Sequence, residues 1–163
     1  MQTSRPYMPG YGTLSADEGS GLLPWSWAEE RLRAAHDFWL ASVWPDGRPH
    51  VMPVWGVWDG EALWFSTSNG SRKSRNLLAD ARCTMSTADA LNPVIMEGQV
   101  ELLTDDESIA RAIALVNEKY GTNYDVSFQD PNVNRTFRFS PSVAFGLLEN
   151  DFAGSPTRWT WDR

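Results

Sequence analysis

FWLASVWPDGRPHVMPVWGVWDGEALWFST, residues 38–67, is the stretch that decides the fold class. Its apolar and aromatic runs are interrupted by Asp-Gly pairs at positions 46–47 and 59–60. Asp-Gly is a strong signal for a tight hairpin turn, because both residues tolerate the backbone conformation that such a turn requires. The stretch therefore predicts three strands, Phe38–Val43, His50–Trp58 and Ala62–Thr67, which follow one another as an antiparallel meander.

Further strands are expected on the C-terminal side of this meander. Strand composition returns in Arg82–Ala88 and Pro93–Leu103, where Gly98 indicates a bulge, and again in Arg135–Leu148 around Pro141. A polar tail with Trp159 and Trp161 closes the chain. Six or so closely spaced strands with few helices are typical of a mainly β fold, here a closed or split antiparallel β-barrel with accessory helices.

Three helices are predicted at the corners of this barrel. Ser26–Glu29 has capping-box spacing, so a short helix is expected to start near Trp27. Ser71 to Asp80 is expected to form a second helix with Leu77 and Leu78 toward the core. A third helix follows a capping box at Thr104–Glu107 and ends at Gly121. One face of this third helix carries Ile109, Ala112, Ile113, Val116 and Tyr120.

The domain organisation follows from length and composition. A chain of 163 residues fits one hydrophobic core. Residues 1–25 are rich in Gly, Pro, Ser and Tyr without periodicity and are expected to form an extended N-terminal arm. Residues 26–163 are then expected to form a single barrel domain. An exposed sheet edge and many tryptophans favour a homodimer.

Charge and cysteine content exclude several classes of function. The formal net charge of -7 disfavours nucleic acid as the main partner, because binding a polyanion requires a surplus of Lys and Arg. The single cysteine, Cys83, excludes an intramolecular disulfide and a site with several thiolates, and it favours a reducing compartment. Neither a signal-peptide pattern nor an apolar run long enough to cross a bilayer is visible, so we expect a cytoplasmic protein without a membrane partner.

LWFSTSNGSRKSRNLLADAR, residues 63–82, is the segment most informative about function. A strand ends there in hydroxyl residues, a Gly-containing loop follows, and three cations open a helix. The N–H groups and the dipole at a helix N-terminus attract phosphate. Hydroxyl donors would come from Ser66, Thr67, Ser68 and Ser71, and positive charge from Arg72 and Lys73.

Cations at a helix N-terminus are unfavourable by a few tenths of a kcal/mol up to about 1 kcal/mol each. Their clustering therefore needs compensation. A bound anion would compensate, and so would Asp80 or another nearby acid, so the residues alone leave a phosphate site and a solvated helix start as alternatives.

Other candidate residues carry weaker signals. His36 and His50 stand alone without the spacing of metal ligands, so no metal site is expected. The tryptophans at 39, 55, 58 and 64 fit a core or an interface better than a cofactor platform. The sequence has no nucleophile elbow, paired-carboxylate signature or Walker loop. No side chain is therefore assigned a catalytic role.

The same segment resembles the phosphate-binding signature of the pyridoxamine 5'-phosphate oxidase-like split-barrel superfamily, in which hydroxyls end a strand before Ser-Arg-Lys. Ser71-Arg72-Lys73 matches it with Thr67 in register, and Pro53-Val54-Trp55 and the hairpin at Asp46-Gly47 are similar to its core. With Arg75-Asn76-Leu77 the chain more closely resembles the actinobacterial branch that contains F420-dependent flavin/deazaflavin oxidoreductases. The resemblance runs from Ser26 to about Phe145 and implies a homodimeric split barrel with two cofactors at the interface.

The resemblance also implies the site residues. Ring-lining residues would be Pro53, Val54 and Trp55, and residues for the phosphate and polar tail would be Ser66, Thr67, Ser68, Ser71, Arg72, Lys73, Arg75 and Asn76. A true pyridoxamine phosphate oxidase carries Arg and Lys where Val51 and Gly56 stand, and a ring-contacting Gln where Pro93 stands. These departures, and the missing C-terminal substrate motif, argue against vitamin B6 chemistry and favour coenzyme F420 over FMN.

Three functions are consistent with this sequence. The first is an F420H2-dependent oxidoreductase that transfers hydride from the reduced deazaflavin to an electron-poor small molecule. The second keeps the fold and uses FMN in an oxidase or reductase. The third, of another class, is a non-catalytic cofactor-binding or carrier protein. In the first two, the reactive chemistry belongs to the cofactor ring, and the protein supplies orientation and exclusion of water.

Overall fold

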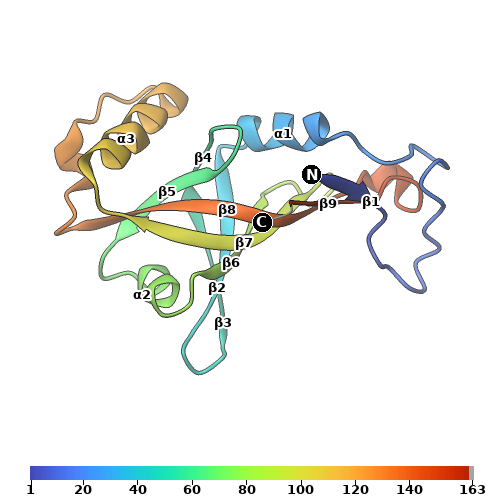
Figure 1. Cartoon of the computed structure of the whole chain (residues 1–163), viewed down its shortest axis with the longest axis horizontal. Coiled ribbons are helices and arrows are strands. Elements are labelled where there is room, and N and C mark those ends of the chain that lie inside the picture. Colours follow the sequence, from blue (N-terminus) through green and yellow to red (C-terminus); the bar gives the residue numbers. More distant parts are fainter. Residues whose placement is uncertain (162–163) are drawn as a thin grey trace.

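The structure, a computed structural model, describes residues 1–161 and is built mainly from antiparallel strands. Figure 1 shows α1 and α3 above the strands and α2 below them. The strands are β1 (Gln2–Ser4), β2 (Asp37–Val43), β3 (Pro49–Trp55), β4 (Val57–Trp58), β5 (Leu63–Ser68), β6 (Arg82–Thr87), β7 (Val94–Leu103), β8 (Asn134–Gly146) and β9 (Thr157–Thr160). The helices are α1 (Trp25–Ala34), α2 (Arg72–Ala79) and α3 (Asp106–Tyr120), with 3-10 turns η1 (Val126–Gln129) and η2 (Glu149–Asp151).

The strands pair in the order β1-β9-β8-β7-β6-β2-β3, and β5 pairs with β8 and β4. The long strand β8 organises this sheet, because its first half pairs with both β5 and β7 and its second half with both β7 and β9. The predicted split antiparallel barrel with accessory helices is confirmed. The predicted bulge at Gly98 is also confirmed, since the register between β7 and β8 shifts between Glu97 and Gly98.

The predicted meander forms only in part at its third strand. The first hairpin forms as expected, with Asp37 opposite Trp55 and Val43 opposite Pro49. The predicted strand His50–Trp58 is interrupted at Gly56. Its last two residues form β4 and pair with Leu63 and Trp64 of β5 as predicted, but β5 otherwise pairs with β8 and does not pair with β3. A Cβ atom on Gly56 would lie 2.8 Å from the Leu63 side chain and 2.9 Å from the Phe38 side chain. The chain therefore turns at the one residue that fits between these two side chains.

One large apolar cluster fills the interior of the barrel. It includes Phe38, Leu40, Met85, Phe137 and Phe139, all of which are at most 1% exposed. A smaller cluster under α3 joins Trp64, Leu103 and Ala112. The alternation of buried and exposed positions along β2 and β6 follows the two-residue period of a strand with one face in the core.

The helices form where they were expected, with different ends. The predicted capping box at Ser26 is wrong, because α1 already begins at Trp25 and its cap, Pro24, offers no side-chain hydrogen bond. Asp105, not Thr104, caps α3 by accepting a hydrogen bond from the Ser108 N–H at 2.8 Å. Gly121 ends α3 in the left-handed conformation, as predicted.

Two further expectations about buried surfaces are wrong. Leu78 of α2 is 48% exposed while Leu77 is buried, because adjacent helix positions differ by about 100° in direction. The expected polar tail contains strand β9, and Trp159 in it is fully buried against Trp25 and Trp27. The tail forms a strand because β8 offers it an unpaired edge.

The N-terminal residues are held along this same edge of the sheet. β1 pairs with β9, and the Arg5 guanidinium donates to the backbone carbonyls of Pro156 (2.9 Å) and Ser15 (2.7 Å). The Asp151 carboxylate accepts from the backbone N–H of Ser20 at 2.5 Å. Residues 2–4 of the expected N-terminal arm, residues 1–25, therefore pair with β9 as part of the sheet.

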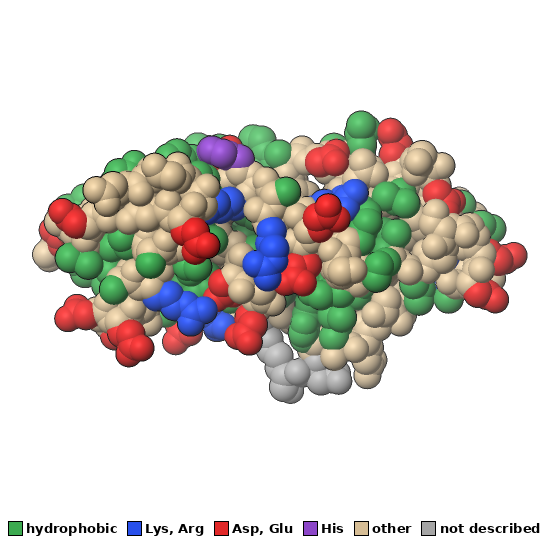
Figure 2. Space-filling model, turned by 90° about the horizontal axis from the view of Figure 1, so that it is seen from above, with side chains coloured by type: hydrophobic (Ala, Val, Ile, Leu, Met, Phe, Trp, Pro, Cys, Tyr) green, Lys and Arg blue, Asp and Glu red, His purple; other side chains and the backbone are tan. Residues whose placement is uncertain are grey.

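Two properties of the surface bear on partners. Within residues 1–161, no helix combines the length and the apolar character that crossing a membrane requires. The face seen in Figure 2 carries acidic side chains beside its few Lys and Arg side chains, and it forms no broad basic area.

Gly98→Ala tests the packing at the bulge. A Cβ atom there would lie 2.9 Å from the Pro141 Cα and closer still to the Ser140 carbonyl oxygen, and backbone atoms cannot move aside cheaply. We expect a loss of about 1 to 3 kcal/mol in the free energy of unfolding, measured by urea denaturation. Gly70→Ala, whose Cβ would meet nothing nearer than 3.9 Å, is the matched control and should be close to wild type. Equal stabilities for both variants would contradict this account of the bulge.

Candidate functional site

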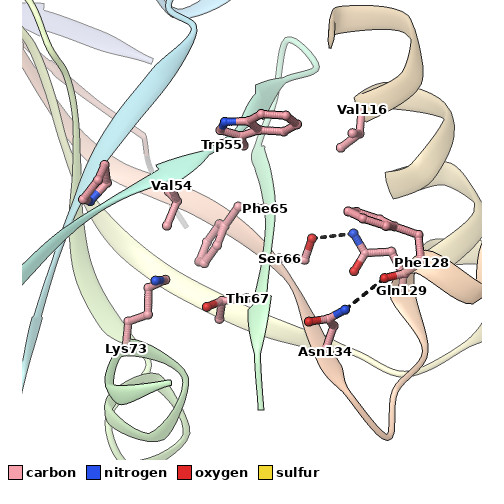
Figure 3. A pocket seen from close by; sticks show the side chains of 11 residues that line it. Val54, Trp55, Phe65, Ser66, Thr67, Lys73, Val116, Phe128, Gln129 and Asn134 are labelled. Carbon is pink, nitrogen blue, oxygen red and sulfur yellow. Dashed lines mark hydrogen bonds between the residues drawn. The ribbon is translucent and has the colours of Figure 1, made fainter. Parts of the chain in front are cut away.

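A pocket opens where β3 and β5 fail to pair. β3 pairs with β2 only, and on the edge of β5 that faces β3 the only pairing, with β4, involves Leu63 and Trp64. Within residues 1–161, the facing edges of the two strands therefore lack strand partners over the length of the pocket. The cavity has a volume of about 280 Å³ (Figure 3). Its lining consists of Pro53, Val54, Trp55, Phe65, Ser66, Thr67, Lys73, Val116, Phe128, Gln129 and Asn134.

Hydroxyl groups connect the end of β5 to the start of α2. Ser71 caps α2, because its Oγ accepts from the Ser74 N–H at 3.1 Å. The same Oγ lies 3.1 Å from the Thr67 Oγ1. The Arg135 guanidinium fixes this corner from β8 by donating to the Asn69 carbonyl (2.8 Å) and to the Ser74 Oγ (2.9 Å). The first turn of α2 is thus held rigidly beside the pocket.

Lys73 brings uncompensated positive charge to the pocket. Its side chain extends from α2 toward Thr67 (Figure 3), and no acid or other acceptor within residues 1–161 forms an ion pair or hydrogen bond with its amino group. Burial lowers the pKa of Lys73, since a charged amine loses hydration there. The Asp80 carboxylate, named above as a compensating acid, pairs with Arg82 at 2.6 Å instead. Among the described residues, the charge of Lys73 has no neutralising partner.

The structure brings six of the eleven predicted site residues into this pocket: Pro53, Val54, Trp55, Ser66, Thr67 and Lys73. Ser71 lies behind Thr67, and the Ser68 Oγ accepts from the Gly70 N–H at 3.3 Å. The side chain of Asn76 turns away into the interior, where its amide donates to the Ser42 Oγ at 3.2 Å.

The remaining two cations, Arg72 and Arg75, lie outside the pocket. The Arg72 guanidinium stacks on Trp44 at 3.6 Å from the ring centroid, and Arg48 lies over the same ring at 4.3 Å. Arg75 is exposed. Burial and the positive charges of Arg75 and Arg48 lower the pKa of Arg72. Arg72 and Arg48 therefore lie together over Trp44 at the tip of the β2–β3 hairpin, where Arg48 also pairs with Asp46 at 2.9 Å.

Aromatic side chains build one wall of the pocket. Trp55 is 46% exposed and stacks on Tyr120 of α3, with ring centroids 4.5 Å apart and planes inclined by 16°. Phe65 stacks on Phe137 in the core at 5.4 Å. Trp55 is thus oriented from behind while part of its ring remains exposed, an arrangement suited to contact with a planar aromatic group.

The end of α3 holds the backbone of Gly56. The Tyr120 hydroxyl accepts from the Gly56 N–H at 2.9 Å and donates to the His36 carbonyl at 2.7 Å. The Lys119 amino group donates to the Gly56 carbonyl at 2.6 Å. Burial lowers the pKa of Lys119 to about 8, against the opposing effect of nearby Asp37, and burial raises the pKa of Tyr120 to about 12. This pair fixes the turn after Trp55.

Sequence reasoning missed the far wall of the pocket, which comes from α3, the loop after it and the start of β8. These residues are Val116, Phe128, Gln129 and Asn134, together with Phe65 on β5. The segment NYDVSFQDPNVN (123–134) has turn composition without periodicity, so no local pattern indicates that Gln129 is 2% exposed. Gln129 is brought to the pocket by the folding of the loop between α3 and β8, which local sequence does not reveal.

The other candidate residues do not line the pocket, although His36 packs edge-on against the lining residue Trp55. Cys83 is buried, and burial raises the pKa of its thiol to about 12, so the thiol stays protonated near neutral pH. His36 contacts Asp37 at 3.0 Å, and His50 packs edge-on against Trp44. In the described part of the chain, no three His, Cys, Asp or Glu side chains converge into a site for a metal ion.

Comparison with known proteins identifies what this arrangement is similar to. Residues 27–142 match the family model described as pyridoxamine 5'-phosphate oxidase. A solved structure described as an F420 reductase is 27% identical, covering 69% of this chain and 91% of that chain with a TM-score of 0.57. A conserved hypothetical protein from Mycobacterium tuberculosis is 26% identical, covering 73% and 81% with a TM-score of 0.63.

A more distant structure shares the fold alone. The heme storage protein from Vibrio cholerae is 20% identical, covering 71% of this chain and 88% of that chain with a TM-score of 0.61. A search of curated protein sequences found no significant match.

Lys119→Met tests the buried amine beside Gly56. In the folded chain Lys119 releases its proton near pH 8, whereas in the unfolded chain it keeps the proton to about its ordinary value of 10.5. The unfolded state therefore binds more protons in this interval, and wild-type stability should rise relative to the variant as pH increases from 7.5 to 10. Urea denaturation of both proteins across this range measures the difference. Parallel stability curves would show that Lys119 titrates like an exposed lysine.

Proposed function

This chain belongs to the pyridoxamine 5'-phosphate oxidase family, and we propose that it is an oxidoreductase that binds coenzyme F420 in the pocket between β3 and β5. In this proposal the reduced coenzyme, held in the pocket, would supply the hydride for reduction of an electron-poor small molecule. Lys73 is the observation that carries the proposal. Its charge has no partner among the described residues, and it stands where hydroxyls, a helix N-terminus and an aromatic pocket meet.

The residues present fit a phosphorylated aromatic ring. Lys73, the Thr67 and Ser71 hydroxyls and the first N–H groups of α2 would hold the phosphate. Trp55 and Phe65 would lie against the ring. The unpaired backbone edges of β3 and β5 offer N–H and C=O groups to a flat ligand, as a sheet edge does to any polar partner. The pocket would thus offer positive charge to the phosphate and aromatic surface to the ring of the same ligand.

Two observations favour F420 over FMN. The similarity to an F420 reductase is accompanied by Val51, Gly56 and Pro93 at positions where a pyridoxamine phosphate oxidase carries Arg, Lys and Gln. Arg72 and Arg75 lie on α2 next to Lys73 but outside the pocket, where a longer anionic tail would extend. FMN is the alternative cofactor, because the same phosphate site would serve it.

The residues of the chain would bind and orient the cofactor, and the bound cofactor would supply the hydride chemistry. The pocket lining contains no carboxylate and no imidazole, so Lys73 is its only titratable side chain, and we assign it to binding. The apolar lining at Val54, Phe65 and Val116 would exclude water from the ring. The lack of an acid–base pair in the lining also fits the second candidate function, a carrier that binds the cofactor without turnover.

We also propose that the protein is a homodimer with the cofactor at the interface. The outer face of β2 and β3 exposes large apolar side chains, including Trp39 (45%), Val51 (51%) and Trp55 (46%). Trp39 lies opposite Pro53 and Ala41 opposite Val51, so these side chains form one continuous strip beside the pocket. A second copy of the chain would cover this strip and complete the open side of the site.

Lys73→Ala should weaken binding of F420 by about 1.5 to 3 kcal/mol, because a charge-assisted hydrogen bond to the phosphate is lost. Isothermal titration calorimetry with the oxidised coenzyme measures this change. Arg33→Ala is the matched control, because this substitution also removes one positive charge but from α1, where Arg33 pairs with Glu29. Binding of F420 and FMN no tighter than millimolar by the wild type would refute the proposed function. Tight binding without turnover of enones and quinones would favour the carrier.

Trp39→Glu should dissociate the dimer, since a charge would be buried at the centre of the interface. We expect the dimer dissociation constant to rise by at least about 30-fold, as for loss of a hot-spot side chain. Sedimentation velocity over a concentration series measures it. Tyr7→Glu, at a residue 91% exposed on the N-terminal segment, is the control and should leave the assembly unchanged. A monomeric wild type would contradict this part of the proposal.

A further inference from the structure

The loop between α3 and β8, residues 122–133, is fixed at both ends. At its start, the Asn117 side chain donates to the Tyr124 carbonyl (2.8 Å) and accepts from the Tyr124 N–H (2.8 Å). At its end, the Asn69 N–H donates to the Val133 carbonyl (2.9 Å), and the Asn69 side chain donates to the Pro131 carbonyl (2.9 Å). The loop therefore presents its central residues to the pocket in a defined position.

Gln129 in the middle of this loop is a buried polar residue that lines the pocket. It is 2% exposed, and its side chain reaches from η1 toward β5 (Figure 3). Its amide N–H donates to the Ser66 Oγ, and its amide oxygen accepts from the Thr136 Oγ1 at 3.4 Å. These contacts tie the loop to β5 and β8.

The contacts leave part of the Gln129 amide free for a ligand. A carboxamide has two N–H donors and two oxygen lone pairs, and the hydrogen bonds within residues 1–161 use one donor and one lone pair. One donor and one acceptor therefore remain on a group that is shielded from bulk water. Buried polar groups are most stable when their hydrogen bonds are satisfied, so the amide favours a ligand that offers an acceptor next to a donor.

The neighbouring Phe128 supplies an aromatic surface at the same place. Its ring stacks on Tyr124 with centroids 3.7 Å apart and planes inclined by 2°, and it is 42% exposed while lining the pocket. The Asn134 side chain donates to the Phe128 carbonyl at 2.9 Å and fixes this backbone (Figure 3). An aromatic face and an amide edge are thus presented together. Lys73 lines the pocket from α2, on the other side of β5 in this view.

We propose that Gln129 is a ligand-binding residue that recognises the edge of a planar heterocycle in which an N–H stands next to a C=O. This inference rests on the proposed function. The inference adds to the proposed function the side chain that would hydrogen-bond to the ring. The pyrimidinedione edge common to F420 and FMN has an N–H next to a C=O. The Gln129 oxygen accepts from the ring N–H, and the free Gln129 N–H donates to the ring carbonyl. Lys73 and Gln129 then hold the ligand at its two polar ends.

The test is a cycle of protein and ligand changes. Dissociation constants are measured for the wild type and Gln129→Met with F420 and with FMN, and with derivatives of both that carry a methyl group on the ring N–H. The wild type should bind the unmodified ring about 10-fold more tightly than the methylated one. Gln129→Met should bind the unmodified ring about 10-fold more weakly than the wild type and lose most of the discrimination against the methyl group. Gln99→Met, on an exposed position of β7, is the matched control and should behave as the wild type.

The outcomes separate this inference from the proposed function. If the wild type binds neither F420 nor FMN, the proposed function fails and this inference fails with it. If the wild type binds and Gln129→Met keeps the wild-type affinity or discrimination, only the role of Gln129 is refuted. Should Gln129→Met not fold, Gln129→Glu keeps the side-chain length and loses the donors. It should bind the unmodified ring at least about 10-fold more weakly, and wild-type affinity would overturn the inference.

Discussion

The backbone of Gly56 is the constraint on which the rest of this structure depends. A side chain there would collide with Phe38 and Leu63, and the N–H and C=O of this residue are bound by Tyr120 and Lys119. The chain therefore leaves the hairpin at this point, and β5 pairs with β8 instead of β3. The pocket is the space that this change of partner leaves between two strand edges.

The charge at α2 is explained by this geometry. A lysine at a helix N-terminus and against apolar surface is unfavourable on both counts. Burial lowers the pKa of Lys73. The capping hydroxyl of Ser71 and the fixed guanidinium of Arg135 hold the corner in place without neutralising Lys73. A fold that keeps such a charge beside an aromatic pocket is suited to binding a phosphorylated ring, which is the basis of the function proposed above.

One side of the pocket comes from a single continuous segment of the chain, and the other side comes from several separate elements. The proposed phosphate side belongs to one continuous segment, β5 and α2, in which the spacing of hydroxyls and cations is local. The proposed ring side is assembled from β3, α3 and η1, which are joined to their neighbours by the stacking of Trp55 on Tyr120 and the hydrogen bond from Gln129 to Ser66. Changes in the loop after α3 would therefore alter which ring is bound while the phosphate site stays intact.

The sequence by itself determined the local features of this protein. Asp-Gly turns and apolar runs predicted the first hairpin and most of the strands, and helix-forming segments predicted the three helices, with the glycine that ends α3. The Ser71-Arg72-Lys73 segment predicted the position of the charged group beside the pocket. These features depend on neighbours a few residues apart. Strand partners, the burial of Leu77 over Leu78, the strand character of the tail and the roles of Gln129, Tyr120 and Arg135 were decided only by the tertiary structure. The contacts of Gln129, Tyr120 and Arg135 join residues more than 60 positions apart, and the other features depend on pairing between separate strands or on which face meets the core. No local pattern records these.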